Sequence, residues 1–513
     1  MSSVPNLAPP APIEAGDDHP FFVSRPVRKD LKRTAVRGVA ANLGAQGTQF
    51  LLGIGSTAVL ARLLTPADFG LVAMTTAFTG FVMLFSDGGL ALATVQREKI
   101  THAQVSTLFW INVVLGFVIA SILFLGAPLI AGFYGEPRLI NITRALAASF
   151  VLTGSAVQHR ALMRRQFQFN RLALVDVIAV AAGVTVAVTM GWCGYGYWSL
   201  VGMSVTMPLV GVTLLWILVP WRPGWPSRGV GAKPMLQFGG DVLSYNILTY
   251  VRGQADLALI GWRWGPISVG FYEKACRMLL MPLRQVSLPL AAVLVPALSR
   301  LTADPPRMAR FYLRALELLT GVTIPIVFAL AVFADELVLI WLGPQWMDAA
   351  RLFRLLGVAA VVAVMINPTT WLVVAMGHTR KYKWMGLASS CAYVTAFAIG
   401  VRNGASGVAI AYSIVSGTLL IPMWAFALHG TPVSLRSVAR ALLPSVAGAL
   451  PAMLAGRWLL HAELLPGMAA VALAVAGYGV VYLAVLFGLF GRWQIYASVI
   501  TDLKKQPRPE PAA

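Results

Sequence analysis

Charge and cysteine are scarce in this sequence, and each shortage excludes a class of protein. Charged residues make up 12% of the 513 positions, about half the share found in a soluble domain, so the composition fits a protein whose solvent is lipid. The three cysteines and six histidines show no metal-binding spacing, and no phosphate-binding P-loop is present. The sequence therefore predicts no metal, no other cofactor and no ATP-driven pump.

Long apolar stretches fill most of the chain instead. Hydrophobic residues make up 58% of it, and a hydrocarbon core about 30 Å thick takes about 20 apolar residues per helix. We therefore expect an all-α, polytopic membrane protein of about fourteen transmembrane helices, over residues 39–61, 69–91, 105–131, 139–158, 172–191, 196–219, 235–260, 269–298, 315–333, 355–376, 384–400, 405–428, 441–459 and 467–490.

The net charge of +20 is distributed in short basic clusters between these stretches. Such clusters indicate membrane topology and not a nucleic-acid partner, which would need one continuous basic surface. With both termini in the cytoplasm, Lys and Arg concentrate in the cytoplasmic connections, as the positive-inside rule requires. The opposite connections hold only Arg62, Arg138, Arg263, Arg402 and Arg457.

The chain contains an internal repeat. The turn that begins Pro66-Ala-Asp-Phe-Gly recurs as Pro266-Ile-Ser-Val-Gly, and segment 124–135 resembles segment 333–343. Two six-helix repeats share one orientation because six is even, so we expect two parallel halves. Chance similarity between apolar segments is the alternative. The expected organisation is a disordered cytoplasmic tail, two six-helix bundles, two additional transmembrane helices and a second cytoplasmic tail, over residues 1–37, 38–220, 234–430, 436–491 and 492–513.

Several motifs of the sequence resemble those of a known protein family. They are Leu60-Ala-Arg-Leu-Leu-Thr-Pro-Ala-Asp-Phe-Gly, Phe85-Ser-Asp-Gly-Gly-Leu, Gln158-His-Arg-Ala-Leu-Met-Arg-Arg, the glycine-rich block 256–275 and Val295-Pro-Ala-Leu-Ser. On these residues the chain resembles the polysaccharide (O-antigen and exopolysaccharide) flippases. The resemblance covers about residues 35–430 and is to the colanic-acid-exporter type of the polysaccharide transporter family, within the multidrug/oligosaccharidyl-lipid/polysaccharide superfamily.

This resemblance implies a fold and a cargo. The two bundles would form a V around a central cavity that opens alternately to each side of the bacterial inner membrane. The cargo would be an undecaprenyl-pyrophosphate-linked glycan, moved from the cytoplasmic to the periplasmic leaflet for polysaccharide or lipopolysaccharide biosynthesis. Membrane lipid is the second expected partner, and polymerase and chain-length proteins are further candidates.

Charged residues inside the spans are the candidate site, because each costs about 2.5–3.5 kcal/mol to insert and usually lines a cavity. Arginine grips phosphate with two parallel hydrogen bonds, so the candidate ligands of the pyrophosphate are Arg252, Lys274, Arg277 and Arg284. Asp256 lies four residues after Arg252 and shares its helix face. An ion pair that only lets the helix insert is the alternative for these two residues. Lys274 and Arg277 share a face as well, with snorkelling at a helix end as their alternative.

The uncharged and acidic candidates have other roles. Gln46 and Asn246 occupy equivalent places in the two repeats and would hydrogen-bond sugar, unless they make ordinary interhelical bonds. A carboxylate in the cavity would bind H⁺ or Na⁺ and couple transport to an ion gradient. The candidates are Asp87, Asp256 and Glu273, with helix capping as an equal alternative for the first.

Two other functions compete with the flippase. A membrane glycosyltransferase or polymerase would need a larger outer loop or a paired-carboxylate motif, and the sequence offers neither. We therefore expect no enzymatic activity. A multidrug or other lipid exporter of the same superfamily is the nearer alternative, and its cavity should be more apolar and more acidic than the cationic one expected here.

Overall fold

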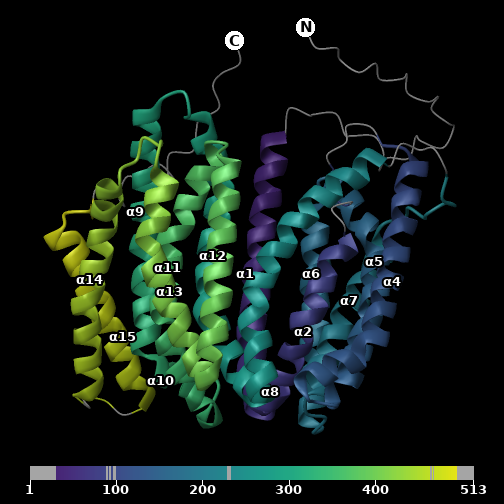
Figure 1. Cartoon of the computed structure of the whole chain (residues 1–513), viewed down its shortest axis with the longest axis horizontal. Helices are drawn as coiled ribbons and strands as arrows, with labels where there is room; N and C mark the ends of the chain where they lie inside the picture. Colours follow the sequence, from purple (N-terminus) through teal and green to yellow (C-terminus); the bar gives the residue numbers. More distant parts are fainter. Residues whose placement is uncertain are drawn as a thin grey trace. The chain divides into compact units, whose positions relative to one another are not determined.

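We describe a computed structural model of the chain (Figure 1). It describes residues 31–87, 91, 94–95, 100–227, 233–462, 465 and 467–493; backbone alone is described at 31–43, 81–87, 233–249, 251–252, 281–282, 284, 288–289, 292 and 379. The N-terminal tail before residue 31 and the C-terminal tail after residue 493 lie outside the described residues.

The described regular elements are all helices, and their contacts divide the chain into two units, Met1–Val251 and Arg252–Ala513. Helix α8, Lys233–Arg300, runs from the first unit into the second. The other helices of the first unit are α1 (Leu31–Leu63), α2 (Pro66–Asp87), α4 (His102–Tyr134), α5 (Arg138–Arg165), α6 (Phe169–Trp192) and α7 (Trp198–Leu218). Because α1 begins at Leu31, the last residues of the expected N-terminal tail, 31–37, are helical.

The second unit continues with helices of similar length. They are α9 (Pro305–Val332), the short α10 (Ala334–Trp341), α11 (Met347–Ala375), α12 (Thr379–Gly400), α13 (Gly404–Leu428), α14 (Leu435–His461) and α15 (Gly467–Ala484), with a π-helical end at Val485–Leu489. Each of the fourteen predicted spans lies on one of these helices, and α8 carries two spans. The all-α prediction and the predicted number of spans are therefore confirmed. Among the described residues, nine helical segments are long and apolar enough to cross a membrane.

The two spans on α8 are separated by a single break at Gly265. Its φ of 75° and ψ of −173° are a backbone conformation that glycine alone adopts without strain. Pro266 follows, just as Pro66 begins α2, where proline fits because its missing N–H has no helical partner. Both turns of the predicted repeat therefore start a helix with proline.

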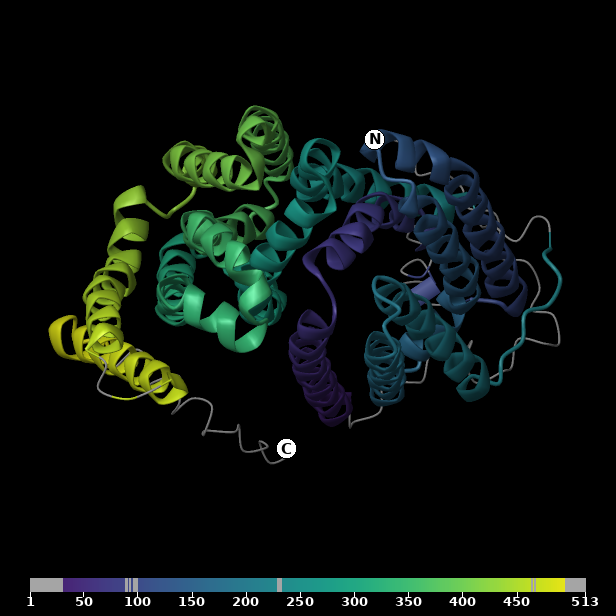
Figure 2. The same cartoon turned by 90° about the horizontal axis from the view of Figure 1, so that it is seen from below.

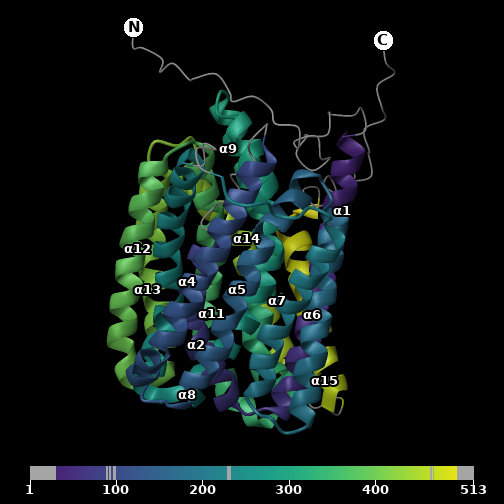
Figure 3. The same cartoon turned by 90° about the vertical axis from the view of Figure 1, so that its right-hand side faces the viewer.

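Three helix pairs of the first unit have packed counterparts in the second unit. In the first unit α4 packs on α5, α6 on α7 and α5 on α7 (Figure 3). Their counterparts in the second unit also pack together, as α9 on α11, α12 on α13 and α11 on α13. Segments 124–135 and 333–343 both end in a glycine of positive φ, Gly135 at 66° and Gly343 at 102°. These shared features agree with the predicted internal repeat.

Glycines allow the closest helix crossings. A Cβ placed on Gly154 of α5 would lie 2.7 Å from the backbone oxygen of Asn112 on α4, and one on Gly116 would lie 2.7 Å from the oxygen of Phe150. Small residues at such crossings let two backbones approach within van der Waals contact, which is the main source of helix association in lipid. A larger residue at either glycine would therefore force α4 and α5 apart at their crossing point.

Candidate functional site

The charged turn of α8 just after Gly265 brings three candidate residues together. The Glu273 carboxylate lies 2.8 Å from Nε of Arg277 and 3.6 Å from Nζ of Lys274. The lysine side chain is 3% exposed, whereas the arginine side chain is 61% exposed. We call these three residues the charged triad. It has one surplus positive charge, and its exposed member is an arginine.

Arg277 is oriented by the contact with Glu273. This contact uses Nε, and the two terminal nitrogens of the guanidinium make no hydrogen bond to another described residue. A guanidinium presents its donors in a rigid fork that matches two phosphate oxygens. Holding one edge of the fork on a carboxylate leaves the other edge for an anionic ligand.

Asp256 has a different environment from the triad. Its carboxylate accepts a hydrogen bond from the Tyr272 hydroxyl at 3.1 Å and one from the backbone N–H of Leu257 at 2.8 Å. Tyr272 is fully buried and Asp256 is half-buried. The bond between these side chains joins the two halves of α8 across the break at Gly265. Tyr272 was not among the predicted site residues. Its contact with Asp256 crosses the break at Gly265, and helical spacing predicts neighbours only within one continuous helix.

Of the other predicted site residues, only Gln46 has a described side chain. Gln46 is exposed on α1 in the first unit. The side chains of Arg252, Arg284, Asn246 and Asp87 lie outside the described residues, so the pairing of Arg252 with Asp256 stays a prediction.

The motif that begins at Gln158 anchors the first unit. The Thr94 hydroxyl donates to the Gln158 side chain at 2.9 Å, and Nη1 of Arg165 donates to the Thr94 carbonyl at 3.2 Å. His159 stacks on Trp216 of α7 with 4.6 Å between ring centroids. Arg160 forms an ion pair with Asp176 of α6 at 2.7 Å. These contacts tie α5 to its neighbours, so the motif has a structural explanation.

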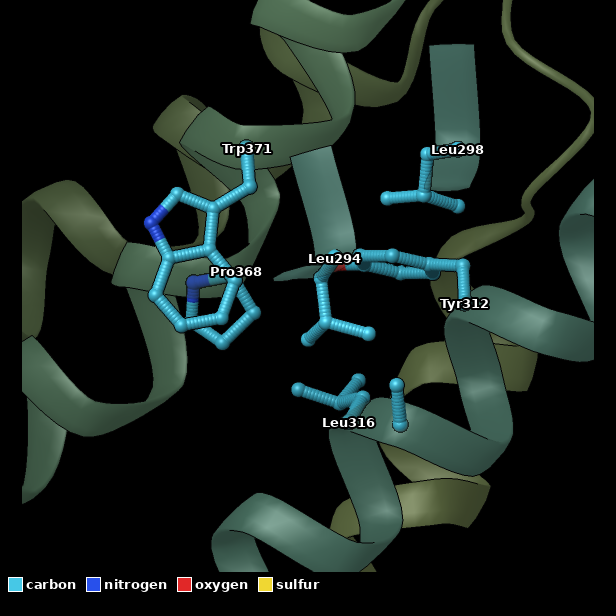
Figure 4. A pocket seen from close by; sticks show the side chains of 7 residues that line it. Leu294, Leu298, Tyr312, Leu316, Pro368 and Trp371 are labelled. Carbon is cyan, nitrogen blue, oxygen red and sulfur yellow. The ribbon is translucent and has the colours of Figure 1, made fainter. Parts of the chain in front are cut away.

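One small pocket lies inside the second unit (Figure 4). Its walls come from α8, α9 and α11, and its volume is about 210 Å³ with open solvent included. The lining residues are Leu294, Leu298, Tyr312, Ala315, Leu316, Pro368 and Trp371. The Tyr312 hydroxyl lies 3.3 Å from the Thr369 hydroxyl, so this polar group is already paired. An apolar lining does not suit a sugar or a pyrophosphate, so the pocket is not a candidate site for either.

Long apolar helices define the chain as a multi-pass membrane protein. Residues 59–351, more than half of the chain, match the family described as "Polysaccharide biosynthesis protein". The chain belongs to this family, and the resemblance to polysaccharide transporters is confirmed.

Individual relatives cover most of the chain. The lipopolysaccharide biosynthesis protein WzxC of Escherichia coli (strain K12) is 25% identical over 73% of this chain and 77% of its own length. The succinoglycan biosynthesis transport protein ExoT of Rhizobium meliloti (strain 1021) is 24% identical over 72% of this chain and 75% of its own. The solved structure of the lipid II flippase MurJ, in an inward closed conformation, aligns with a TM-score of 0.69 and 12% identity, covering 89% of this chain and 98% of MurJ. This last likeness shows the fold.

Proposed function

We propose that this protein is a flippase for lipid-linked oligosaccharides. It would carry undecaprenyl-pyrophosphate-linked repeat units from the cytoplasmic to the periplasmic leaflet of the bacterial inner membrane, with both of its termini in the cytoplasm. Family membership supports the polysaccharide pathway, and the name of one relative, a succinoglycan transport protein, supports a transport step. The observation that carries the cargo assignment is the charged triad, whose surplus charge suits a phosphate.

The physical problem of this reaction is the polar headgroup. Each unpaired hydroxyl moved into hydrocarbon costs about 2–7 kcal/mol, and an ionised pyrophosphate costs far more. A flippase must therefore offer a wet and partly cationic path while the lipid tail stays in the bilayer. In the proposed mechanism the two bundles form a V around such a cavity and open alternately to each side.

Each candidate residue has a part in this mechanism. Arg277 grips the pyrophosphate with the free edge of its guanidinium, and Glu273 holds that guanidinium in place while it balances the buried Lys274. Arg252 and Arg284 add positive charge to the path. Gln46 and Asn246 donate and accept hydrogen bonds from sugar hydroxyls as the glycan passes.

Asp256 is the better candidate for coupling to an ion gradient. Glu273 already balances two cations, whereas the partners of Asp256 in the described residues are a hydroxyl and an N–H. Binding of H⁺ or Na⁺ to Asp256 would weaken its bond to Tyr272 and loosen the link across Gly265. Asp87 is a further proposed coupling residue, in the first unit.

Flux measurements in reconstituted vesicles test the cargo. The purified protein should move a fluorescent polyprenyl-pyrophosphate oligosaccharide between leaflets and should not expel cationic dyes. Expulsion of the dyes without movement of the oligosaccharide would instead identify a multidrug exporter. Hydrolysis or elongation of the glycan by the purified protein would identify an enzyme of the same pathway. Addition of polymerase and chain-length proteins to the vesicles tests those partners.

A further inference from the structure

Helix α9 contains a gap in its hydrogen-bond ladder at Pro325. Proline has no N–H, so it cannot bond to the carbonyl of the residue four positions earlier, Gly321. Gly321 is buried within the described structure, and inside a membrane no water replaces the missing donor. Some other group must therefore satisfy this carbonyl.

Helix α15 supplies the donor. The Tyr482 hydroxyl donates to the Gly321 carbonyl at 2.7 Å, which is the bond that Pro325 cannot make. One turn away, the Tyr478 hydroxyl donates to the carbonyl of Pro325 itself at 2.8 Å. Both tyrosines are 5% exposed. The two bonds differ, because the Pro325 carbonyl can also accept from the N–H of Ala329 in the ordinary α-helical pattern.

A third polar contact lies on the same face of α9. Nε of Arg492, just beyond α15, lies 2.9 Å from the carboxylate of Glu317. Residues 317, 321 and 325 are spaced four apart, so the three contacts follow one side of the helix. The opposite side carries Tyr312 and Leu316, which line the pocket of Figure 4.

Helix α14 makes further polar contacts at the C-terminal end of α9. Nη1 of Arg457 lies 3.3 Å from the Glu336 carboxylate and 3.4 Å from the carbonyl of Val332, the last residue of α9. Helices α14 and α15 pack against each other as a pair (Figure 2) and both contact α9. The pair lies after the two predicted six-helix repeats, and nothing in the repeat pattern explains why it is there.

We propose that the C-terminal helix pair is a brace for α9, and that Tyr482 is the positioning residue that replaces the hydrogen bond lost at Pro325. By completing the ladder from outside, the brace holds the α9 backbone in one conformation around Pro325. This proposal uses contacts within the second unit alone and does not depend on which cargo is carried.

A double-mutant cycle on the full chain tests the proposal. Tyr482→Phe should lower the melting temperature by about 1–3 °C. Pro325→Ala returns an N–H to the position that faces the Gly321 carbonyl, so Tyr482→Phe should then cost almost nothing. Tyr478→Phe is the matched control: its acceptor keeps a helical donor, so its smaller loss should be the same in both backgrounds.

A distance measurement separates positioning from simple packing. Spin labels at Arg310→Cys and Leu330→Cys, with the three native cysteines replaced, lie about 30 Å apart along a helix and on either side of Pro325. Tyr482→Phe should broaden the distribution of distances, and adding Pro325→Ala should narrow it again. Equal losses of stability from Tyr482→Phe with and without Pro325→Ala, or no loss in either background, would overturn the proposal. If Tyr482→Phe alone does not fold, folding of the double variant supports the proposal and failure of both overturns it.

Discussion

A variant without the negative charge of Glu273 should be less stable than the wild type. The loss should come from the buried Lys274, which would no longer be paired with that carboxylate. The lysine is 3% exposed and lies 3.6 Å from the carboxylate, whereas Arg277 is 61% exposed. Breaking a buried ion pair by removing one partner costs about 3–5 kcal/mol, while an exposed pair contributes about 0–1 kcal/mol. Glu273→Gln should therefore destabilise the protein by an amount close to the first figure.

Second substitutions identify which cation causes the loss. Replacing the lysine as well, in Glu273→Gln/Lys274→Met, removes the buried charge and should recover most of the stability, because an apolar pair of similar volume often replaces a buried ion pair without cost. Glu273→Gln/Arg277→Ala should remain as unstable as the single variant, because the buried lysine has still lost the Glu273 carboxylate.

Thermal or denaturant unfolding of the four proteins in nanodiscs measures these differences directly. A loss of about 3 kcal/mol changes the unfolding equilibrium by roughly 150-fold, which is well within reach. The reasoning is wrong if Glu273→Gln is as stable as the wild type, or if removal of Arg277 restores stability and removal of Lys274 does not.

Three further predictions follow from particular contacts. Arg277→Ala should abolish export of surface polysaccharide in cells while the protein stays in the membrane, and Arg277→Lys should restore it in part, since lysine lacks the planar fork; normal output from the alanine variant would exclude the assigned role. Gly154→Ala should destabilise the α4–α5 crossing by about 1–3 kcal/mol, because its Cβ would lie 2.7 Å from the Asn112 oxygen. The control Gly126→Ala has no atom within 4 Å of its Cβ and should leave the stability unchanged. Equal melting temperatures of the two variants would show that the crossing relaxes freely. Asp256→Asn keeps a hydrogen-bond partner for Tyr272 but loses the charge, so vesicle flux should no longer respond to an imposed H⁺ or Na⁺ gradient; an unchanged response would move the coupling site elsewhere.

The helices could be predicted from the sequence because lipid leaves the backbone little choice. A spanning segment must satisfy its own N–H and C=O groups, so an apolar stretch of sufficient length becomes a helix. The turns that begin with Pro66 and Pro266 were predictable as well, since proline and glycine have fixed conformational preferences. The short helix α10 was not predicted, because eight residues next to a span carry no separate hydropathy signal.

The partners of individual side chains were harder to predict. The three-residue spacing of Lys274 and Arg277 predicts that they share a helix face. Their common partner, Glu273, depends on side-chain conformation, which the spacing does not determine. The bond from Tyr272 to Asp256 crosses the Gly265 break, where helical spacing no longer applies. Tyr482 and Gly321 are far apart in sequence, and no local pattern in a single sequence identifies such a pair.

Binding of the lipid-linked cargo tests most directly whether a positively charged path in the membrane recognises a pyrophosphate. The affinity of nanodisc-embedded protein for an undecaprenyl-pyrophosphate oligosaccharide should fall about 10- to 100-fold in Arg277→Ala, because a hydrogen bond to a charged group contributes about 1.5–3 kcal/mol. Added salt should weaken binding by the wild type more than by this variant. An affinity that is the same in both proteins at every salt concentration would contradict the account.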